Sequence, residues 1–183
     1  QQQLADYLSE IDQREAASGR DAGAASDHFF ALDVETANAA YDSICQIGLV
    51  EFRDGVEVGC ESWLIDPDDD FDDYNIEIHG ITPAMVRGKP TFDVAARDLI
   101  FRVGGSVLVS HTHFDRTAIG QACARYMLPV PEFRWLDSAR VARRTWDHCR
   151  NAGYGLKDLA QFLAIEFRHH DALEDARAAG LVL

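Results

Sequence analysis

The order of the apolar runs constrains the fold of this chain most strongly. Three strand-like runs follow one another at Phe29–Val34, Ile44–Phe52 and Val56–Ile65. The tripeptide Arg53-Asp54-Gly55 between the last two is typical of a hairpin turn. These runs predict an antiparallel start to a sheet.

Helical and strand-like runs alternate in the rest of the chain. Two short strands are predicted, over Val107–Val109 and Phe133–Leu136. Helices are predicted over Thr91–Phe101, Phe114–Tyr126, Ser138–Trp146, the run with Leu156, Leu159, Ala160 and Leu163, and Ala172–Leu183. This order predicts an α/β fold with a mixed five-stranded sheet, three antiparallel strands and then parallel ones, flanked by helices. At 183 residues and 47% hydrophobic content, the chain is long enough for one domain with a core.

The first 27 residues differ in character from the rest. They are polar, and Leu4, Leu8 and Ile11 recur at helical spacing, so a short helix and a linker are predicted before a domain over residues 28–183. The hexamer Gln3–Leu8 loosely resembles peptides that dock on sliding clamps, and a plain terminal helix or disorder is the alternative. Because the chain starts with Gln and stops soon after Asp175, we expect a trimmed product with a truncated C-terminal end.

The chain is strongly acidic, with a net charge of −14 and an isoelectric point near 4.7. This balance argues against a sequence-specific DNA reader, but not against a nuclease whose divalent cations neutralise its carboxylates. Nucleic-acid binding is then expected to be weak and non-processive. Four scattered cysteines without a CxxC pair, and no long apolar run, predict a cytoplasmic protein with reduced thiols and no membrane span.

Asp33 and Glu35 stand two residues apart in the first strand-like run. Residues at this spacing share one face of a strand, with Cα atoms about 7 Å apart, while Leu32 and Val34 face the other way. Two acids at the end of an apolar strand are costly to bury without a cation. Acids that simply reach solvent at a strand end are the alternative.

Two further segments carry acids. Asp115 falls in the first turn of a predicted helix, where an acid that complements the helix dipole is common. Asp171 and Glu174 resemble a capping box, which places Asp175 about one turn into the last helix and His170 just before it. A surface histidine near an acid is the alternative for His170. Four carboxylates and one imidazole together suit the hydrolysis of a phosphodiester with two Mg²⁺ ions.

With these segments identified, the chain resembles the DnaQ-like family of 3′–5′ exonucleases, the group with four acids and a histidine that includes the proofreading epsilon subunit of bacterial DNA polymerase III. The family's three motifs look like Asp33-Val34-Glu35-Thr36, Phe114-Asp115, and His170 with Asp175. The connecting stretches that also match are Cys45-Gln46-Ile47-Gly48, Ile78-His79-Gly80-Ile81-Thr82 and Leu136-Asp137-Ser138. The resemblance covers roughly residues 28–183.

The resemblance implies a ribonuclease H-like fold and stepwise removal of nucleotides from a 3′ end. It implies that two Mg²⁺ or Mn²⁺ ions are held by Asp33, Glu35, Asp115 and Asp175, and that His170 is the general base. It also implies substrate contacts from Thr36, His79 and Phe114. One departure is that Ser110-His111 stands where the family has His-Asn, and we keep His111 among the substrate-binding residues.

Three other patterns in the sequence suggest alternative sites. Tyr154 with Asp158 matches the third motif of a sister group in which tyrosine replaces the histidine, but it precedes the helix that the match places one element upstream. The loop Asp66–Asp73 lacks the ligand alternation of a calcium loop and is predicted to be solvated. The helix over Ser138–Trp146 carries Arg140, Arg143 and Arg144, near Trp135 and Trp146. These arginines either steer the phosphates of a strand toward the metals or form an ordinary solvated helix face beside core tryptophans.

The function expected from these residues is a metal-dependent 3′–5′ exonuclease that releases 5′-mononucleotides from single-stranded DNA ends, in proofreading or repair. RNA trimming is the alternative within enzymes. The alternative of another class is a proofreading-type subunit whose main role is assembly with a DNA polymerase.

Overall fold

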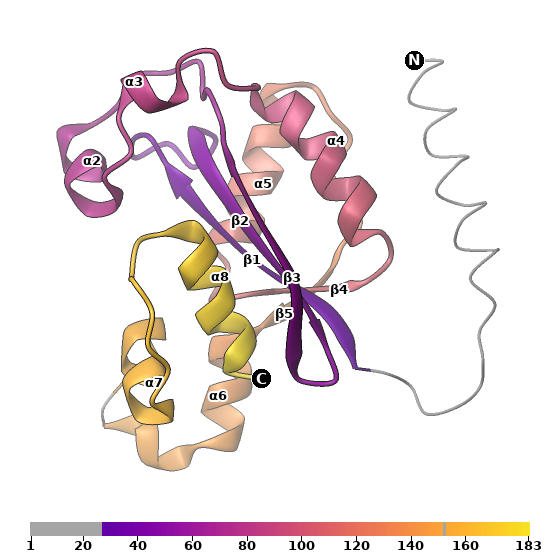
Figure 1. Cartoon of the computed structure of the whole chain (residues 1–183), viewed down its shortest axis with the longest axis vertical. Coiled ribbons are helices and arrows are strands. Elements are labelled where there is room, and N and C mark those ends of the chain that lie inside the picture. The colour runs from indigo at the N-terminus through magenta and orange to yellow at the C-terminus, as the bar shows by residue number, and fades with distance from the viewer. Residues whose placement is uncertain (1–26, 152) are drawn as a thin grey trace.

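The computed structural model describes residues 27–151 and 153–183 (Figure 1). The predicted helix with Leu4, Leu8 and Ile11, and the clamp-like hexamer, lie outside these residues. No helix in the described part is long and apolar enough to cross a membrane.

Five strands form one mixed sheet with the order β3-β2-β1-β4-β5, as predicted. The strands are β1 (His28–Thr36), β2 (Ile44–Arg53), β3 (Val56–Leu64), β4 (Val107–Ser110) and β5 (Arg134–Asp137). The first three pair antiparallel, while β4 runs parallel to β1 and β5 parallel to β4. In the β2–β3 hairpin, Asp54 and Gly55 both have positive φ, at 52° and 76°, which is the backbone that two-residue hairpin turns require.

The helices that cover the sheet begin and end close to the predicted positions. They are α4 (Phe92–Val103), α5 (Phe114–Arg125), α6 (Ser138–Thr145), α7 (Leu156–Leu163) and α8 (Ala172–Leu181). Three short elements were not predicted, namely α2 (Asp73–His79), α3 (Pro83–Val86) and the 3₁₀ helix η1 (Asp147–Arg150). Helix α2 buries none of its residues and so has no apolar periodicity for a sequence argument to detect.

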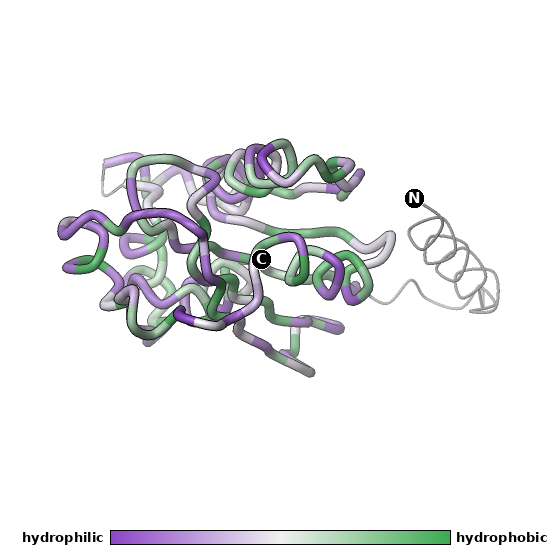
Figure 2. Tube along the Cα trace, turned by 90° about the horizontal axis from the view of Figure 1, so that it is seen from above, coloured by the Kyte–Doolittle hydropathy of each residue, from purple (hydrophilic) through white to green (hydrophobic). Residues whose placement is uncertain are grey.

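Helices pack on both faces of the sheet. On one face, Phe30, Leu32 and Val34 of β1 form the main core with side chains of α4 and α5. On the other face, Ala31 packs against Ala176 of α8, and α8 in turn packs on α6 and α7. Figure 1 shows α8 and α4 on opposite sides of the strands. Hydrophobic and hydrophilic stretches alternate along the trace (Figure 2), as expected for elements that bury one face.

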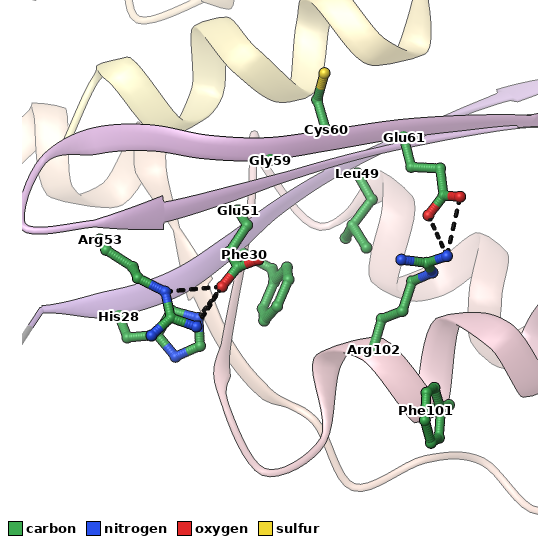
Figure 3. Close-up of a pocket in the computed structure, with 10 residues that line it drawn as sticks. All are labelled: His28, Phe30, Leu49, Glu51, Arg53, Gly59, Cys60, Glu61, Phe101 and Arg102. Atoms are coloured by element: carbon green, nitrogen blue, oxygen red, sulfur yellow. Dashed lines mark hydrogen bonds and ion pairs between the residues drawn. The ribbon is translucent and has the colours of Figure 1, made fainter.

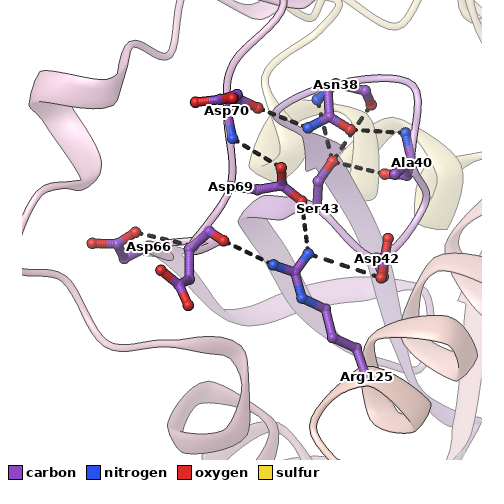
Figure 4. Close-up of polar contacts among 9 residues, drawn as sticks. Asn38, Ala40, Asp42, Ser43, Asp66, Asp69, Asp70 and Arg125 are labelled. Atoms are coloured by element: carbon purple, nitrogen blue, oxygen red, sulfur yellow. Dashed lines mark hydrogen bonds and ion pairs between the residues drawn. The ribbon is translucent and has the colours of Figure 1, made fainter.

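The acidic loop after β3 is fastened to the domain. Arg125 at the end of α5 donates to Asp69 at 2.8 Å and to the carbonyl of Asp68 at 2.8 Å, and Asn38 donates to the carbonyl of Asp70 at 2.7 Å (Figure 4). The predicted solvated loop is thus solvated only in part, because the guanidinium of Arg125 neutralises some of its charge.

Candidate active site

The acid pair of β1 lies on the face that α8 covers. Leu32 and Val34 are buried in the main core, while Asp33 and Glu35 between and beyond them are only partly buried and point to the opposite face. The alternation expected from the sequence is therefore present. It places two carboxylates at the end of the central strand.

Asp115 reaches β1 from the first turn of α5. Its side chain is 1% exposed, and its Oδ1 accepts the backbone N–H of Val34 at 3.0 Å. Pairing between β1 and β4 ends at Ala31, so this N–H has no strand partner on that side and the carboxylate takes it instead. Asp115 thus does more than complement its own helix dipole, because it ties the start of α5 to the strand that carries Asp33 and Glu35.

The start of α8 lies close against β2, opposite the acid pair. Gly48 pairs with Asp33 across the ladder, and a Cβ at Gly48 would lie 2.2 Å from the carbonyl oxygen of Ala172. Gln46, which pairs with Glu35, uses its Oε1 to accept the N–H of Ala172 at 3.3 Å. The stretch Gln46-Ile47-Gly48 therefore has a physical reason: it lets the first turn of α8 approach the acids.

Asp175 enters the site from this first turn and is 4% exposed. Asp171 caps the helix as predicted, since its carboxylate accepts the N–H groups of Leu173 and Glu174. Glu174 departs from the reciprocal capping box, because its side chain pairs with Arg177 instead.

The acids meet in one cavity of about 310 Å³. Carboxylate oxygens of Asp33, Glu35 and Asp175 lie within 4.8 Å of one another. Asp115 lines the same cavity, together with Phe114, His111, His169 and His170.

Like charges and burial oppose full ionisation of this cluster. Burial first, and then the charges of Asp115, Asp175 and Glu35, raise the pKa of Asp33 well above its ordinary value. Burial and the charge of Asp175 raise the pKa of Glu35 to about 8, and burial raises the pKa of Asp115 to about 7. Hard oxygen donors that repel one another in a small cavity fit a divalent cation, which would restore their ionised forms.

The two histidines before α8 occupy the cavity wall. His170 has a left-handed backbone, with φ of 66°, and its N–H donates to Asp175 Oδ2 at 3.1 Å. Burial and the neighbouring His169 lower the pKa of His170, which favours the neutral imidazole. A neutral imidazole beside the acids can accept a proton.

His169 was not singled out from the sequence. Its Nδ1 lies 3.0 and 3.1 Å from the two oxygens of Asp175, and its ring stacks on that of His170 at 3.8 Å between centroids. With the oxygens of Asp175 as acceptors, Nδ1 is assigned as the donor. The sequence signal was the His169-His170 doublet, but nothing local says which ring turns toward the acid.

The predicted substrate-binding residues divide into two groups. Phe114 and His111 line the cavity, whereas Thr36 and His79 lie beside it, with His79 Nε2 donating to the carbonyl of Thr36 at 3.1 Å. Both ring nitrogens of His111 are occupied within the protein, by Ser138 Oγ at 2.8 Å and the carbonyl of Tyr154 at 3.0 Å. His111 therefore braces the cavity wall.

Comparison with known proteins identifies the family to which the chain belongs. The RNase_T exonuclease family model matches residues 30–183. The PolC-type DNA polymerase III proteins of Oceanobacillus iheyensis and Listeria monocytogenes are 30% and 31% identical to this chain, over 86% and 80% of its length. Those stretches are 11% and 10% of the polymerases, so the chain spans about a tenth of the length of these relatives.

Solved structures show the same fold. Exonuclease X in complex with 5′ overhanging duplex DNA has a TM-score of 0.63 and 28% identity, covering 84% of this chain and 89% of that one. The 3′-exonuclease that recognises the histone mRNA stem-loop has a TM-score of 0.76 at 16% identity, covering 99% and 70%, and so supports the fold alone. On the family match and this fold, the chain belongs to the RNase_T exonuclease family of DnaQ-like, ribonuclease H-like nucleases.

Proposed function

We propose that this chain is a metal-dependent 3′–5′ exonuclease that releases 5′-mononucleotides from single-stranded DNA ends, in proofreading or repair. The convergence of Asp33, Glu35 and Asp175 carries the proposal, because three oxygen donors from two distant segments point into one cavity. Asp115, anchored to β1 through Val34, is the fourth acid.

In this proposal, Asp33, Glu35, Asp115 and Asp175 hold two Mg²⁺ or Mn²⁺ ions. When bound, the ions supply positive charge that stabilises the scissile phosphate and the leaving oxygen. His170 accepts the proton of the attacking water, a role that its neutral form and its place on the cavity wall support. His169 holds Asp175 through Nδ1 and keeps that carboxylate directed at the cavity.

The terminal nucleotide is proposed to lie against Phe114, whose ring is supported edge-on by Tyr41 at 5.1 Å. Thr36 and His79, joined by a hydrogen bond, form a second contact region beside the cavity. His111 lines the cavity and is held by Ser138 at the start of α6. Tyr154, the rival third-motif residue, donates its hydroxyl to the carbonyl of Trp146, which supports a structural role.

DNA is the proposed substrate because the relatives at 28–31% identity are named for DNA, as polymerases or as a complex with duplex DNA. RNA trimming stays the alternative. The experiment is digestion of DNA and RNA oligomers labelled at either end, with Mg²⁺, Mn²⁺ or a chelator, and with an Asp33→Asn variant as the inactive control.

The expected result is metal-dependent release of mononucleotides from the 3′ end, faster on single-stranded DNA than on RNA or on blunt duplex. Internal cuts, products from the 5′ end or metal-independent cleavage would refute the exonuclease proposal. Faster turnover of RNA would reassign the substrate and leave the mechanism standing.

The polymerase relatives also support the subunit alternative, in which the domain assembles with a DNA polymerase or a sliding clamp. Capture of purified polymerase and clamp proteins by the full chain, with and without residues 1–27, tests this alternative.

A cytoplasmic location is also proposed. It rests on the free thiols of Cys45, Cys60, Cys123 and Cys149.

A further inference from the structure

A second cavity, of about 280 Å³, adjoins the acid cavity. It lies between the start of α5, strand β5 and helix α6, and Thr112 lines both cavities. Three arginines line it, namely Arg116 of α5 and Arg140 and Arg144 of α6. We call this cavity, with Trp135 on its wall, the arginine groove.

Within residues 27–151 and 153–183, no carboxylate forms an ion pair with Arg116, Arg140 or Arg144. Ion pairs are formed instead by Arg53, Arg102, Arg125, Arg150, Arg168 and Arg177. Asp137 does lie in the groove, but its Oδ1 accepts two backbone N–H groups, those of Thr112 and Arg140, each at 3.2 Å.

A cavity elsewhere in the protein shows the contrast. In Figure 3, Glu51 lies against Arg53 and His28, and Glu61 lies against Arg102, so the charges of that cavity cancel locally. Its cations serve the fold. The cations of the arginine groove remain available in a chain whose net charge is −14, which makes the groove the expected place for an anionic polymer.

The groove also has a direction and an aromatic wall. Arg116 and Trp135 line it and also line a third cavity farther along α5, with Phe133. Three adjoining cavities therefore form one path. It begins at the acid cavity, passes Thr112 into the arginine groove, and continues along Trp135 into the third cavity. Aromatic side chains and guanidinium groups along a groove are the usual elements of single-strand binding. Trp135 is partly buried against the main core and still lines the groove.

Thr112, the residue between the two cavities, has a strained backbone. Its φ of 76° is unfavourable for a β-branched side chain, and the conformation is held by Asp137 at its N–H and by Ser110 Oγ, which donates to its carbonyl at 2.9 Å. Strain of this kind persists where the surrounding structure fixes a functional geometry. Here the strained residue lines both the acid cavity and the arginine groove.

We propose that the arginine groove binds the phosphodiester backbone of the single strand upstream of the 3′ nucleotide that is removed. This inference rests on the proposed function and deepens it. In this proposal, Arg140 and Arg144, which line the groove, contact the strand. Arg143 instead lies over the ring of Tyr154, 5.5 Å from its centroid, and has a structural contact.

The test compares Arg140→Ala/Arg144→Ala with Arg87→Ala/Lys89→Ala, which removes the same charge from the loop after α3, at the opposite end of the view from α6 (Figure 1). Binding of a labelled oligothymidylate of about 8 nucleotides is measured by fluorescence anisotropy in a chelator, at several salt concentrations. Cleavage of the same oligomer and of a dinucleotide is measured with Mn²⁺.

For the groove variant, we expect oligomer affinity to fall about tenfold or more and the slope of log affinity against log salt to shrink by about 1.4, from two lost phosphate contacts. The ratio of kcat/KM for the oligomer to that for the dinucleotide should fall similarly, whereas the control variant should retain the wild-type slope and ratio. Equal losses in the two variants, or an unchanged slope in the groove variant, would overturn the proposal.

Failure of the proposed function looks different. In that case the wild-type chain releases nothing from either substrate, while the anisotropy comparison in chelator still decides whether the groove binds a strand. Thermal unfolding of both variants verifies that neither loss reflects a misfolded protein.

Discussion

Replacement of Gly48 by alanine should separate the two halves of the acid cluster. The new Cβ would lie 2.2 Å from Ala172 O and 2.4 Å from Leu173 N, where ordinary contacts begin at 3.4 Å. Backbone atoms cannot swing aside, so the first turn of α8 must move outward by about 1 Å, as overpacked contacts usually relax by backbone shifts. Asp175 and the preceding His170 would move away from Asp33 with that turn.

Overpacking of this kind costs about 1–3 kcal/mol, which for a chain of this length is roughly 2–12 °C in Tm. Thermal unfolding with and without Mn²⁺ measures both effects. We expect a lower Tm in chelator and a smaller stabilisation by Mn²⁺, because the ligand oxygens no longer converge.

Gly180→Ala is the matched control. A Cβ there would lie 2.2 Å from the buried ring of Phe52, near the end of α8 rather than at its start. It should lower the Tm while the stabilisation by Mn²⁺ stays close to that of the wild type. A Gly48→Ala protein with wild-type Tm and wild-type response to Mn²⁺ would refute the reasoning about α8.

Three further results are expected. Asp33→Asn should reduce turnover about a thousandfold or more, yet raise the metal-free Tm at pH 8, because it removes a carboxyl group whose ionisation is opposed in the folded state by burial and by the neighbouring acids. A lower Tm would contradict this argument. In chelator, stability should fall as the pH rises from about 4.5 to 8, since the folded pKa of Glu35 is raised and the unfolded chain loses its proton first, at a cost of roughly 4 kcal/mol at most. Urea denaturation at pH 5 and pH 8 measures the fall in the free energy of unfolding, and Mn²⁺ should restore much of the loss. A free energy of unfolding that stays constant or rises with pH would exclude this role of Glu35. His170→Ala should lower kcat by about 10²–10⁴-fold, whereas Tyr154→Phe should retain most activity in oligomer digestion, and the reverse pattern would reassign the general base.

Local patterns were enough to predict most of the fold. The alternation of Leu32 and Val34 with Asp33 and Glu35 depends only on strand geometry, and the hairpin at Asp54 and Gly55 depends only on turn chemistry. Helix α2 escaped prediction because it buries nothing and therefore carries no apolar period.

The sequence indicated which residues belong to the candidate site, but not the contacts that hold these residues in place. The hydrogen bond between Asp115 and Val34 joins residues 81 positions apart. The bond between His169 and Asp175 comes beside a left-handed backbone at His170 that no local pattern indicated. Likewise, the small side chain at Gly48 becomes informative only once Ala172 is known to lie against it. Such contacts arise from packing between distant segments, which no local pattern encodes.

The late position of α8 in the chain has a consequence for biosynthesis. The contact between Gln46 and Ala172 spans 126 residues, so the ribosome must finish nearly the whole domain before this helix can dock. Contacts of such long sequence separation form slowly and late. On the proposed function, a polypeptide not yet synthesised as far as α8 would be unable to degrade cellular nucleic acid, since Asp175 lies in that helix.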